Sequence, residues 1–464
     1  MDTFYKRKLG LTISALLFLS SFSIFAQNKI YTLVELTDVA KSYLPSLMQK
    51  RALVNSAKAF VTDTRHSFLP QLKLSDQISL GSDNSLAGSY LPLGITPSTS
   101  SGVRSSSNNQ AATGNIAVFY SEYELMNFGL NKAKINNAES FVNFSEADFQ
   151  KENYYITLQV GQLYFDLLKT QYRLDADKQN VNRYDSIFKV IQALTASGLK
   201  PGSDSSLAKA ELSKTKITYN QTLGNLNQLK QQLSYLTGIP AANISIDSMS
   251  NKFIVTRPML IDFSVDTINN PLIDYYAKKK DIYLSNDKLI NKTYLPKIIL
   301  AGSTWARGSS IQYNDNYESL STGLGYQRFN YAAGVAITYN LFNNLYKKDK
   351  LAINRFQLQA SDFELQQQKL LLNSSLLQAD NSLKITEINL LELPIQLKSA
   401  EDTYQQKLAQ YKAGIISLID LTNASFVLYR SQTDYIETMT DWYVAQLNKS
   451  AAAGNLNQFI QTIK

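Results

Sequence analysis

Alternation of side-chain types with a period of two marks four segments of the chain. A polar-against-apolar alternation runs from Gln71 to Leu80, and a row of large residues alternating with small ones runs from Tyr331 to Leu341. Such a period places successive side chains on opposite faces of a β-strand. Two of the segments open with a Leu-Pro pair. The pattern predicts strands at 68–80, 115–126, 295–306 and 331–342.

The segments around these strands are helical in pattern. Residues 130–196 and 345–412 contain no helix-stopping residue other than Pro394, where we expect a kink. At about 1.5 Å per residue, helices of this length extend roughly 100 Å. Each long helix is followed by a glycine-containing turn and a return helix. The predicted helices are 45–66, 130–196, 204–237, 271–294, 345–412 and 420–452.

The first return helix carries a coiled-coil seam. Its apolar residues and threonines recur at alternating intervals of four and three, which is the 3.5-residue repeat of a coiled coil. These positions are Ala208, Leu212, Thr215, Tyr219, Thr222, Leu226, Leu229, Leu233 and Leu236. The remaining positions are rich in Gln, Asn, Ser, Thr and Lys, as on a surface with water on one side and partner helices on the other. On the helices alone, a soluble antiparallel coiled coil is an alternative.

The same order of elements occurs twice, and residues match at constant offsets. The Leu-Pro pair at Leu69 recurs at Leu295, 226 residues later, and Gly198 recurs at Gly414, 216 residues later. Other pairs keep one of these offsets: Pro45 and Pro271, Asp204 and Asp420, Ala208 and Ala424, Leu212 and Leu428, Tyr219 and Tyr435. Two constant offsets that differ by ten residues indicate two homologous halves, with one insertion or deletion between the Leu-Pro segment and the Leu-x-Asn segment (Leu125-Met126-Asn127 and Leu341-Phe342-Asn343). The expected segments are a signal peptide (1–26), a first repeat (27–237), a connector (238–270), a second repeat (271–450) and a C-terminal tail (451–464).

Composition excludes several function classes. The chain has no cysteine and one histidine, His66, so it lacks thiol nucleophiles, disulfides, cysteine-based metal sites and any His/Cys pair. It also lacks a P-loop pattern. We therefore expect no enzyme activity, no metal and no cofactor. The net charge of +8 is scattered, which argues against a nucleic-acid partner. The nearest basic cluster is Tyr346-Lys347-Lys348-Asp349-Lys350, which suits a solvated helix start.

The first 26 residues resemble a secretory signal peptide. Lys6, Arg7 and Lys8 precede an apolar run from Leu9 to Phe25 and a small residue, Ala26. A retained membrane anchor is the alternative. No later stretch holds 18 consecutive apolar residues, so we expect the exported chain either to be soluble or to insert as a β-barrel. Four strands cannot close a membrane barrel, because the smallest have about eight. A barrel would therefore be shared between copies of the chain.

These features together resemble the TolC family of outer membrane efflux channels, the outer membrane factors, over nearly all of the mature chain. The residues that carry the resemblance are Leu69-Pro70, Leu295-Pro296, Tyr339-Asn340-Leu341-Phe342-Asn343, the Gly198/Asp204 and Gly414/Asp420 turns, Leu418 to Tyr435, and Ala445-Gln446-Leu447-Asn448. The resemblance implies a mainly α chain with a membrane β-barrel part. Two tandem repeats would supply long helical-barrel hairpins and four strands per chain. A homotrimer would then form a 12-stranded β-barrel in the outer membrane and a large helical barrel in the periplasm, with an equatorial collar built from 238–270 and the C-terminal tail.

The resemblance also implies partners and sites. The channel would be a passive exit duct, served by a periplasmic adaptor protein and an inner membrane pump. The adaptor-docking tips would be Ser197, Gly198, Leu199, Ala413, Gly414 and Ile415, and the gate and selectivity residues would be Asp204, Tyr411, Asp420 and Asn423. The gate arginine of the family falls on Ile416. Simpler roles are a left-handed turn for the glycines and helix N-capping for Asp204 and Asp420.

Other functions stay open from the sequence. The same duct could serve a type I protein-secretion system. Heavy-metal efflux is disfavoured by six methionines, one histidine and no cysteine. A protein of another class, a soluble coiled-coil interaction protein of the periplasm, would have the same helices without a membrane-inserted sheet.

Overall fold

The computed structural model describes residues 29–85, 103–104, 106–246 and 270–463. The chain divides into two compact units, which are described separately. The sheet unit comprises Ala52–Glu146 and Tyr276–Glu364, and the helical unit comprises Met1–Arg51, Ala147–Tyr275 and Leu365–Lys464. The expected signal peptide lies outside the described residues.

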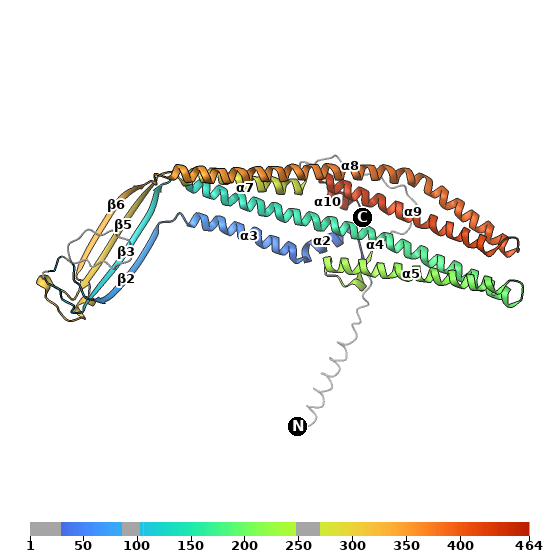
Figure 1. The fold of residues 1–464 in the computed structure, drawn as a ribbon, viewed down its shortest axis with the longest axis horizontal. Helices are drawn as coiled ribbons and strands as arrows, with labels where there is room; N and C mark the ends of the chain where they lie inside the picture. Colours follow the sequence, from blue (N-terminus) through green and yellow to red (C-terminus); the bar gives the residue numbers. More distant parts are fainter. Residues whose placement is uncertain (1–28, 86–102, 105, 247–269, 464) are drawn as a thin grey trace, which may run out of the picture. The chain divides into compact units, whose positions relative to one another are not determined.

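The elements follow the order that the sequence predicts (Figure 1). The strands of the main sheet are β2 (Gln71–Gly81), β3 (Ala112–Met126), β5 (Lys297–Ser309) and β6 (Arg328–Thr338). The helices are α2 (Leu33–Tyr43), α3 (Pro45–His66), α4 (Leu130–Ala196), α5 (Gly202–Thr237), α7 (Pro271–Thr293), α8 (Asn343–Lys412), α9 (Leu418–Ala453) and α10 (Leu456–Thr462). Short elements are β1 (Ile30–Tyr31), η1 (Ala241–Asn243), β4 (Ser245–Ile246), η3 (Tyr313–Asp315) and η4 (Thr322–Leu324).

Boundaries differ from the expected ones mainly in the strands. β2 begins at Gln71 rather than 68, because the Leu69 amide still donates to the His66 carbonyl (3.0 Å) at the end of α3. β6 ends at Thr338 rather than 342. There the Asn340 side chain accepts a hydrogen bond from the Phe342 amide (2.9 Å), which turns the chain toward α8. α8 is continuous through Pro394.

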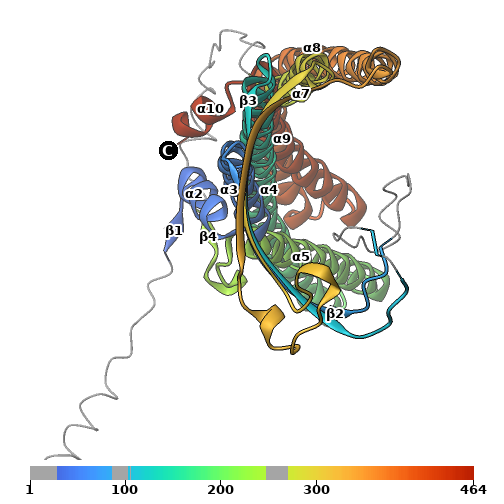
Figure 2. The same cartoon turned by 90° about the vertical axis from the view of Figure 1, so that its left-hand side faces the viewer.

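The main sheet is antiparallel throughout, with the strand order β2-β3-β5-β6. The four strands lie side by side in Figure 1, and Figure 2 shows that the sheet is curved. β2 pairs only with β3 and β6 only with β5 among the described strands, so β2 and β6 are open edges. The register places Leu74, Phe119, Thr304 and Tyr331 in one cross-strand row.

One face of this sheet is apolar along its edge strands. Residues opposite one another in an antiparallel pair share a face, so the register puts the apolar side chains of β2 on the same face as the large side chains of β6. These residues are 62–87% exposed: Leu72, Leu74, Ile78, Leu80, Phe329, Tyr331, Val335 and Ile337. The other face carries Gln71, Lys73, Ser75, Gln77 and Ser79 of β2. The predicted alternation is therefore present in three dimensions.

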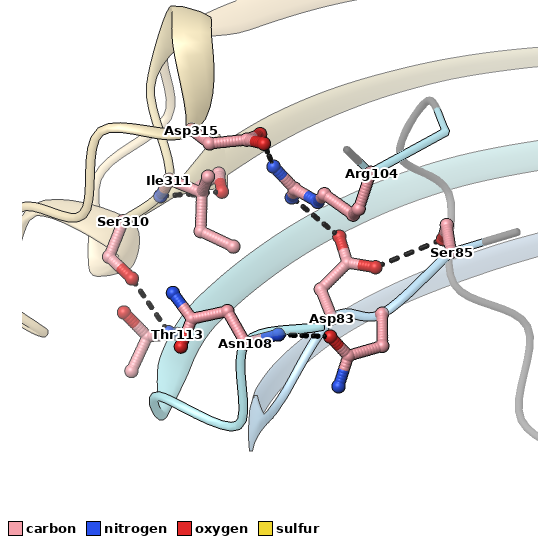
Figure 3. Close-up of polar contacts among 10 residues, drawn as sticks. Asp83, Ser85, Arg104, Asn108, Thr113, Ser310, Ile311 and Asp315 are labelled. Atoms are coloured by element: carbon pink, nitrogen blue, oxygen red, sulfur yellow. Dashed lines mark hydrogen bonds and ion pairs between the residues drawn. The ribbon is translucent and has the colours of Figure 1, made fainter. Parts of the chain in front are cut away.

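The β5–β6 connection folds back onto β3 (Figure 3). The Ser310 hydroxyl accepts a hydrogen bond from the Thr113 amide (2.8 Å), and the Asn115 side chain donates to the Leu324 carbonyl (2.8 Å). Arg104 forms ion pairs with Asp83 (3.0 Å) and with Asp315. Because Arg104 and Asp83 belong to the β2–β3 connection and Asp315 to the other, these contacts tie the two strand connections together.

The helical unit has an aromatic core. Phe165 of α4 stacks on Tyr443 of α9, with ring centroids 5.6 Å apart, and Trp442 and Phe459 are almost fully buried beside them. β1 pairs in parallel with β4, and β4 is the last described element of the expected connector (238–270). Residues 247–269 of that connector lie outside the described residues. α10 covers part of the expected C-terminal tail.

The predicted seam of α5 faces the inside of the helical unit. Seven of its nine positions are buried, and Tyr219 and Leu229 are half-buried. Most of the heptad residues are therefore buried within a single chain.

Candidate functional site at the helical hairpin tips

Both helical hairpins reverse direction through the same turn. Gly198 has φ +73° and Gly414 has φ +75°, a left-handed conformation that a side chain disfavours. At each tip the glycine amide donates three residues back, and the next amide donates five residues back. These bonds are Gly198 to Thr195, Leu199 to Leu194, Gly414 to Tyr411 and Ile415 to Gln410 (2.9–3.0 Å). This is the Schellman helix ending, so the expected turn role of both glycines is confirmed.

The residue after each glycine is apolar and exposed. Leu199 is 71% exposed and Ile415 is 73% exposed. The other predicted docking residues, Ser197, Gly198, Ala413 and Gly414, are exposed as well. A helix ending of this type often buries the residue after its glycine against the helix. Here both apolar side chains instead remain available at the end of the hairpins.

Behind the tips, side chains from four helices form one apolar cluster. We call it the tip cluster: Ile187 and Ile191 of α4, Ala208 of α5, Ala400, Tyr404 and Tyr411 of α8, and Leu418, Leu421 and Leu428 of α9. Ile416, where the sequence comparison with the family placed a gate arginine as an expectation, packs against this cluster. The two hairpins are therefore joined at this level by apolar packing.

Tyr411 is one of the two tyrosines of the tip cluster. Only 2% of the residue is exposed, and among the described residues its hydroxyl has no hydrogen-bond partner. Burial raises the pKa of Tyr411, and the nearby Asp204 charge raises it further. The Lys200 ammonium lies 5.4 Å from the centre of the Tyr411 ring, a cation–π contact from the first hairpin to the second. The structure therefore brings the predicted pair Asp204 and Tyr411 into one neighbourhood without a hydrogen bond between them.

The two aspartates of the tips differ in their hydrogen bonds. Asp420 and Ser417 form a capping box: the Ser417 hydroxyl accepts from the Asp420 amide (3.3 Å), and the Asp420 carboxylate accepts from the Ser417 amide (3.1 Å). The hydrogen bonds from the Ser417 hydroxyl and amide lower the pKa of Asp420. The N-cap of α9 is thus Ser417, and Asp420 supports it from the first turn.

The first hairpin has no such box. Pro201 is the N-cap residue of α5 and provides no side-chain hydrogen bond. The expected N-capping role is therefore wrong for both aspartates, each of which lies three residues after the N-cap, and only Asp420 takes part in a capping box. Asn423, the fourth predicted gate residue, is exposed one turn after Asp420.

Between the aromatic core and the tip cluster, α4 and α9 contact each other through polar side chains. The Tyr429 hydroxyl donates to the buried Asp177 carboxylate (2.6 Å), and burial together with that carboxylate raises the pKa of Tyr429 to about 12. Arg183 donates to Gln432 (3.3 Å) and lies 5.2 Å from the Tyr404 ring. We call Asp177, Arg183, Tyr429 and Gln432 the polar belt. Neither the polar belt nor the contact of Lys200 follows from a local sequence pattern, because these contacts join residues far apart in the chain.

Within the described ranges, no three acidic or histidine side chains come together in a way that could hold a metal ion. In those same ranges, no helix combines the length and the apolar character needed to cross a membrane.

The comparisons with known proteins agree with this architecture. Residues 36–239 match the model of the family described as outer membrane efflux protein. A comparison with curated protein sequences finds no significant match. Among solved structures, VceC of Vibrio cholerae is 15% identical, with a TM-score of 0.71 over 91% of this chain and 96% of that one.

Two further structures match equally well. The CmeC outer membrane channel of Campylobacter jejuni is 16% identical, with a TM-score of 0.71 over 93% of this chain and 86% of that one. The open state of the MtrE outer membrane channel of Neisseria gonorrhoeae is 16% identical, with a TM-score of 0.71 over 94% of each chain. At these identities the structural agreement concerns the fold. Together with the family match, it confirms the resemblance of this chain to the TolC family of outer membrane efflux channels.

Proposed function

We propose that this protein is the outer membrane exit duct of a tripartite efflux system for small molecules. Three copies share one 12-stranded β-barrel in the outer membrane, and their helices form a channel across the periplasm. The duct itself is passive. A periplasmic adaptor protein and an inner membrane pump supply the substrate and the energy. The family match of residues 36–239 supports this assignment.

The observation that carries the proposal is the pair of open edges on the main sheet. β2 and β6 are each 11 residues long, and each has one edge whose backbone groups pair with no described strand. A row of exposed apolar side chains runs along each of these strands. Unpaired backbone groups are not tolerated in lipid, so such a sheet must continue into another copy. Strands of this length suit a tilted crossing of the hydrocarbon layer. Three copies of four strands give an even-numbered barrel of a size known in outer membranes.

In the helical unit, neighbouring helices contact one another, and α8 also has an exposed apolar face. α4 contacts α9 through Lys169 and Asp441 (3.3 Å), and α9 contacts α8 through Lys449 and Asp380 (2.9 Å). α8 carries two seams. One is buried in the chain and includes Leu372, Ala379, Leu383 and Leu393.

The second seam of α8 is exposed. It also follows a 3.5-residue spacing, and its apolar side chains are 58–71% exposed: Leu370, Leu377, Ile388, Leu391 and Ile395. A helix with two seams packs against neighbours on two sides. We propose that the exposed seam receives a helix of the next copy, which closes the ring.

The hairpin tips are the proposed contact with the adaptor. Their turns end in exposed apolar residues, Leu199 and Ile415, that the chain itself leaves uncovered. We propose that the adaptor covers them, and that the gate lies one turn away, where Asp204, Tyr411, Asp420 and Asn423 are found. In a trimer Asp420 would place three carboxylates at one level.

Reversal potentials of single channels in a salt gradient test the duct and its selectivity together. A conducting trimer with modest cation preference is expected. Asn423→Asp should raise the cation preference, because it doubles the carboxylates at that level, and Asp420→Asn should lower it. A protein that never conducts would contradict the duct, whereas unchanged reversal potentials in both variants would contradict only the role of these two residues.

Two other functions remain candidates. The exit duct of a type I protein-secretion system would have the same fold, and export of a protein substrate from cells carrying a matching transporter would favour it. A soluble periplasmic coiled-coil protein would be recovered from the periplasmic fraction rather than from the outer membrane.

A further inference from the structure

The start of α8 forms an exposed surface with apolar and basic parts. We call it the junction surface and define it as Leu341, Phe342, Leu345, Tyr346, Lys347, Lys348 and Lys350. Its four apolar members are 84%, 62%, 60% and 51% exposed, in chain order. They follow directly on the exposed apolar row of β6, which ends at Ile337 (72% exposed). Exposed apolar side chains therefore continue along the chain from β6 into the first turn of α8.

Three lysines give this surface its positive charge. Lys348 and Lys350 are exposed and Lys347 is half-buried, and within the described residues none of them forms an ion pair. The acidic side chain among them, Asp349, is exposed and forms no ion pair with any described residue. The first turn of α8 contains no acidic residue. The three lysines lie in the second turn of α8, and no ion pair within the described chain accounts for their clustering.

Neighbouring helix ends add to the positive charge. The Asn343 side chain donates to the Tyr294 carbonyl (2.9 Å), which joins the start of α8 to the segment that follows α7. Lys292, at the end of α7, is exposed and lies beside Gly129, which immediately precedes α4. Lys132 in the first turn of α4 is exposed too, and that turn also lacks an acidic residue. Cations from three helices thus gather at this end of the sheet.

We propose that the junction surface binds anionic phospholipid headgroups in the leaflet of the outer membrane that faces the periplasm. This rests on the proposed function, in which the sheet spans that membrane. Aromatic and aliphatic side chains at the edge of an apolar face lie at the level of the headgroups. Lysines just beyond them reach anionic lipid phosphates with their flexible stems. Charge complementarity and continuity with the apolar face both favour a lipid surface as the occupant.

Native mass spectrometry of the full mature protein, equilibrated with equal amounts of phosphatidylglycerol and phosphatidylcholine in detergent, tests this site. The variant is Lys348→Gln combined with Lys350→Gln. The matched control is Lys209→Gln combined with Lys216→Gln, two exposed lysines on α5 that form no ion pair in the described chain. A lysine near an anionic lipid surface favours binding by about fivefold. We therefore expect the phosphatidylglycerol preference to fall roughly tenfold or more in the variant and to persist in the control.

The spectra also distinguish failure of the lipid site from failure of the proposed duct. A trimer that retains both lipids equally, or a control that loses the preference as fully as the variant, would overturn the lipid site and leave the duct intact. A monomer that retains neither lipid would contradict the duct and the lipid site together.

Discussion

The two hairpin tips share one turn but differ in how the return helix starts. Gly198 and Gly414 adopt nearly the same left-handed conformation. After the second turn, Ser417 and Asp420 close a capping box, whereas after the first turn Pro201 leaves α5 without a side-chain cap. The Asp420 carboxylate is therefore held by its own helix. Asp204 is not engaged in this way, and its charge acts on Tyr411 of the other hairpin. At matched positions of the two repeats, Asp420 therefore supports the cap of its own helix, whereas the charge of Asp204 acts on a residue of the other hairpin.

Replacing Tyr411 tests the contact between the hairpins and has the largest expected effect. Tyr411→Ala removes a ring that is 2% exposed, and large-to-small changes of a buried aromatic cost about 3–5 kcal/mol. Tyr411→Phe keeps the ring and removes a hydroxyl that has no hydrogen-bond partner among the described residues, so it should be nearly neutral. Denaturant unfolding in detergent measures both. A loss above about 1.5 kcal/mol for the phenylalanine variant would mean that the hydroxyl is bonded in the assembled protein.

The shared turn predicts equal effects at the two tips. Alanine at Gly198 or at Gly414 would meet no neighbouring atom within 4 Å but would have to adopt the left-handed conformation. That costs about 1–2 kcal/mol per residue. Thermal unfolding of Gly198→Ala and Gly414→Ala should show matching losses. A loss at one tip alone would show that the two turns are not equivalent.

The capping box predicts the smallest effect, and the effect should depend on pH. Ser417→Ala should cost about 1 kcal/mol, whereas Ser203→Ala in the uncapped first turn of α5 should cost almost nothing. The box lowers the pKa of Asp420 in the folded state. Its carboxylate therefore stabilises the fold above the unfolded pKa of about 3.9, and this contribution is lost as the pH falls through the lower folded value.

The difference in unfolding temperature between the wild type and Ser417→Ala should therefore shrink below about pH 4. A difference that is constant from pH 7 to pH 3 would show that Asp420 takes no part in the cap.

The sequence pattern predicts the regular parts of the fold because they depend on local periodicity. The long helix α4 covers the expected range, and the seam of α5 from Ala208 to Leu236 faces inward as its heptad indicates. The face of each strand follows from alternation. Strand ends are predicted less well, because turns such as the one at Asn340 depend on single side-chain hydrogen bonds.

The candidate site is only partly readable from the sequence. The Ser417-x-x-Asp420 box and both glycine turns are local signals. The contact of Lys200 with Tyr411 and the hydrogen bond from Tyr429 to Asp177 join residues more than 200 positions apart. No local pattern specifies such pairs, because they depend on how two hairpins pack.

The central claim is that the open edges of the sheet are closed by other copies of the chain. The most direct test is the native mass, by light scattering in detergent, of the mature protein extracted from the outer membrane fraction. A mass of three chains is predicted, because the resemblance to the TolC family implies a trimer and a closed ring of copies pairs every edge of β2 and β6. A monomer in the soluble periplasmic fraction would leave those edges unpaired and contradict the account.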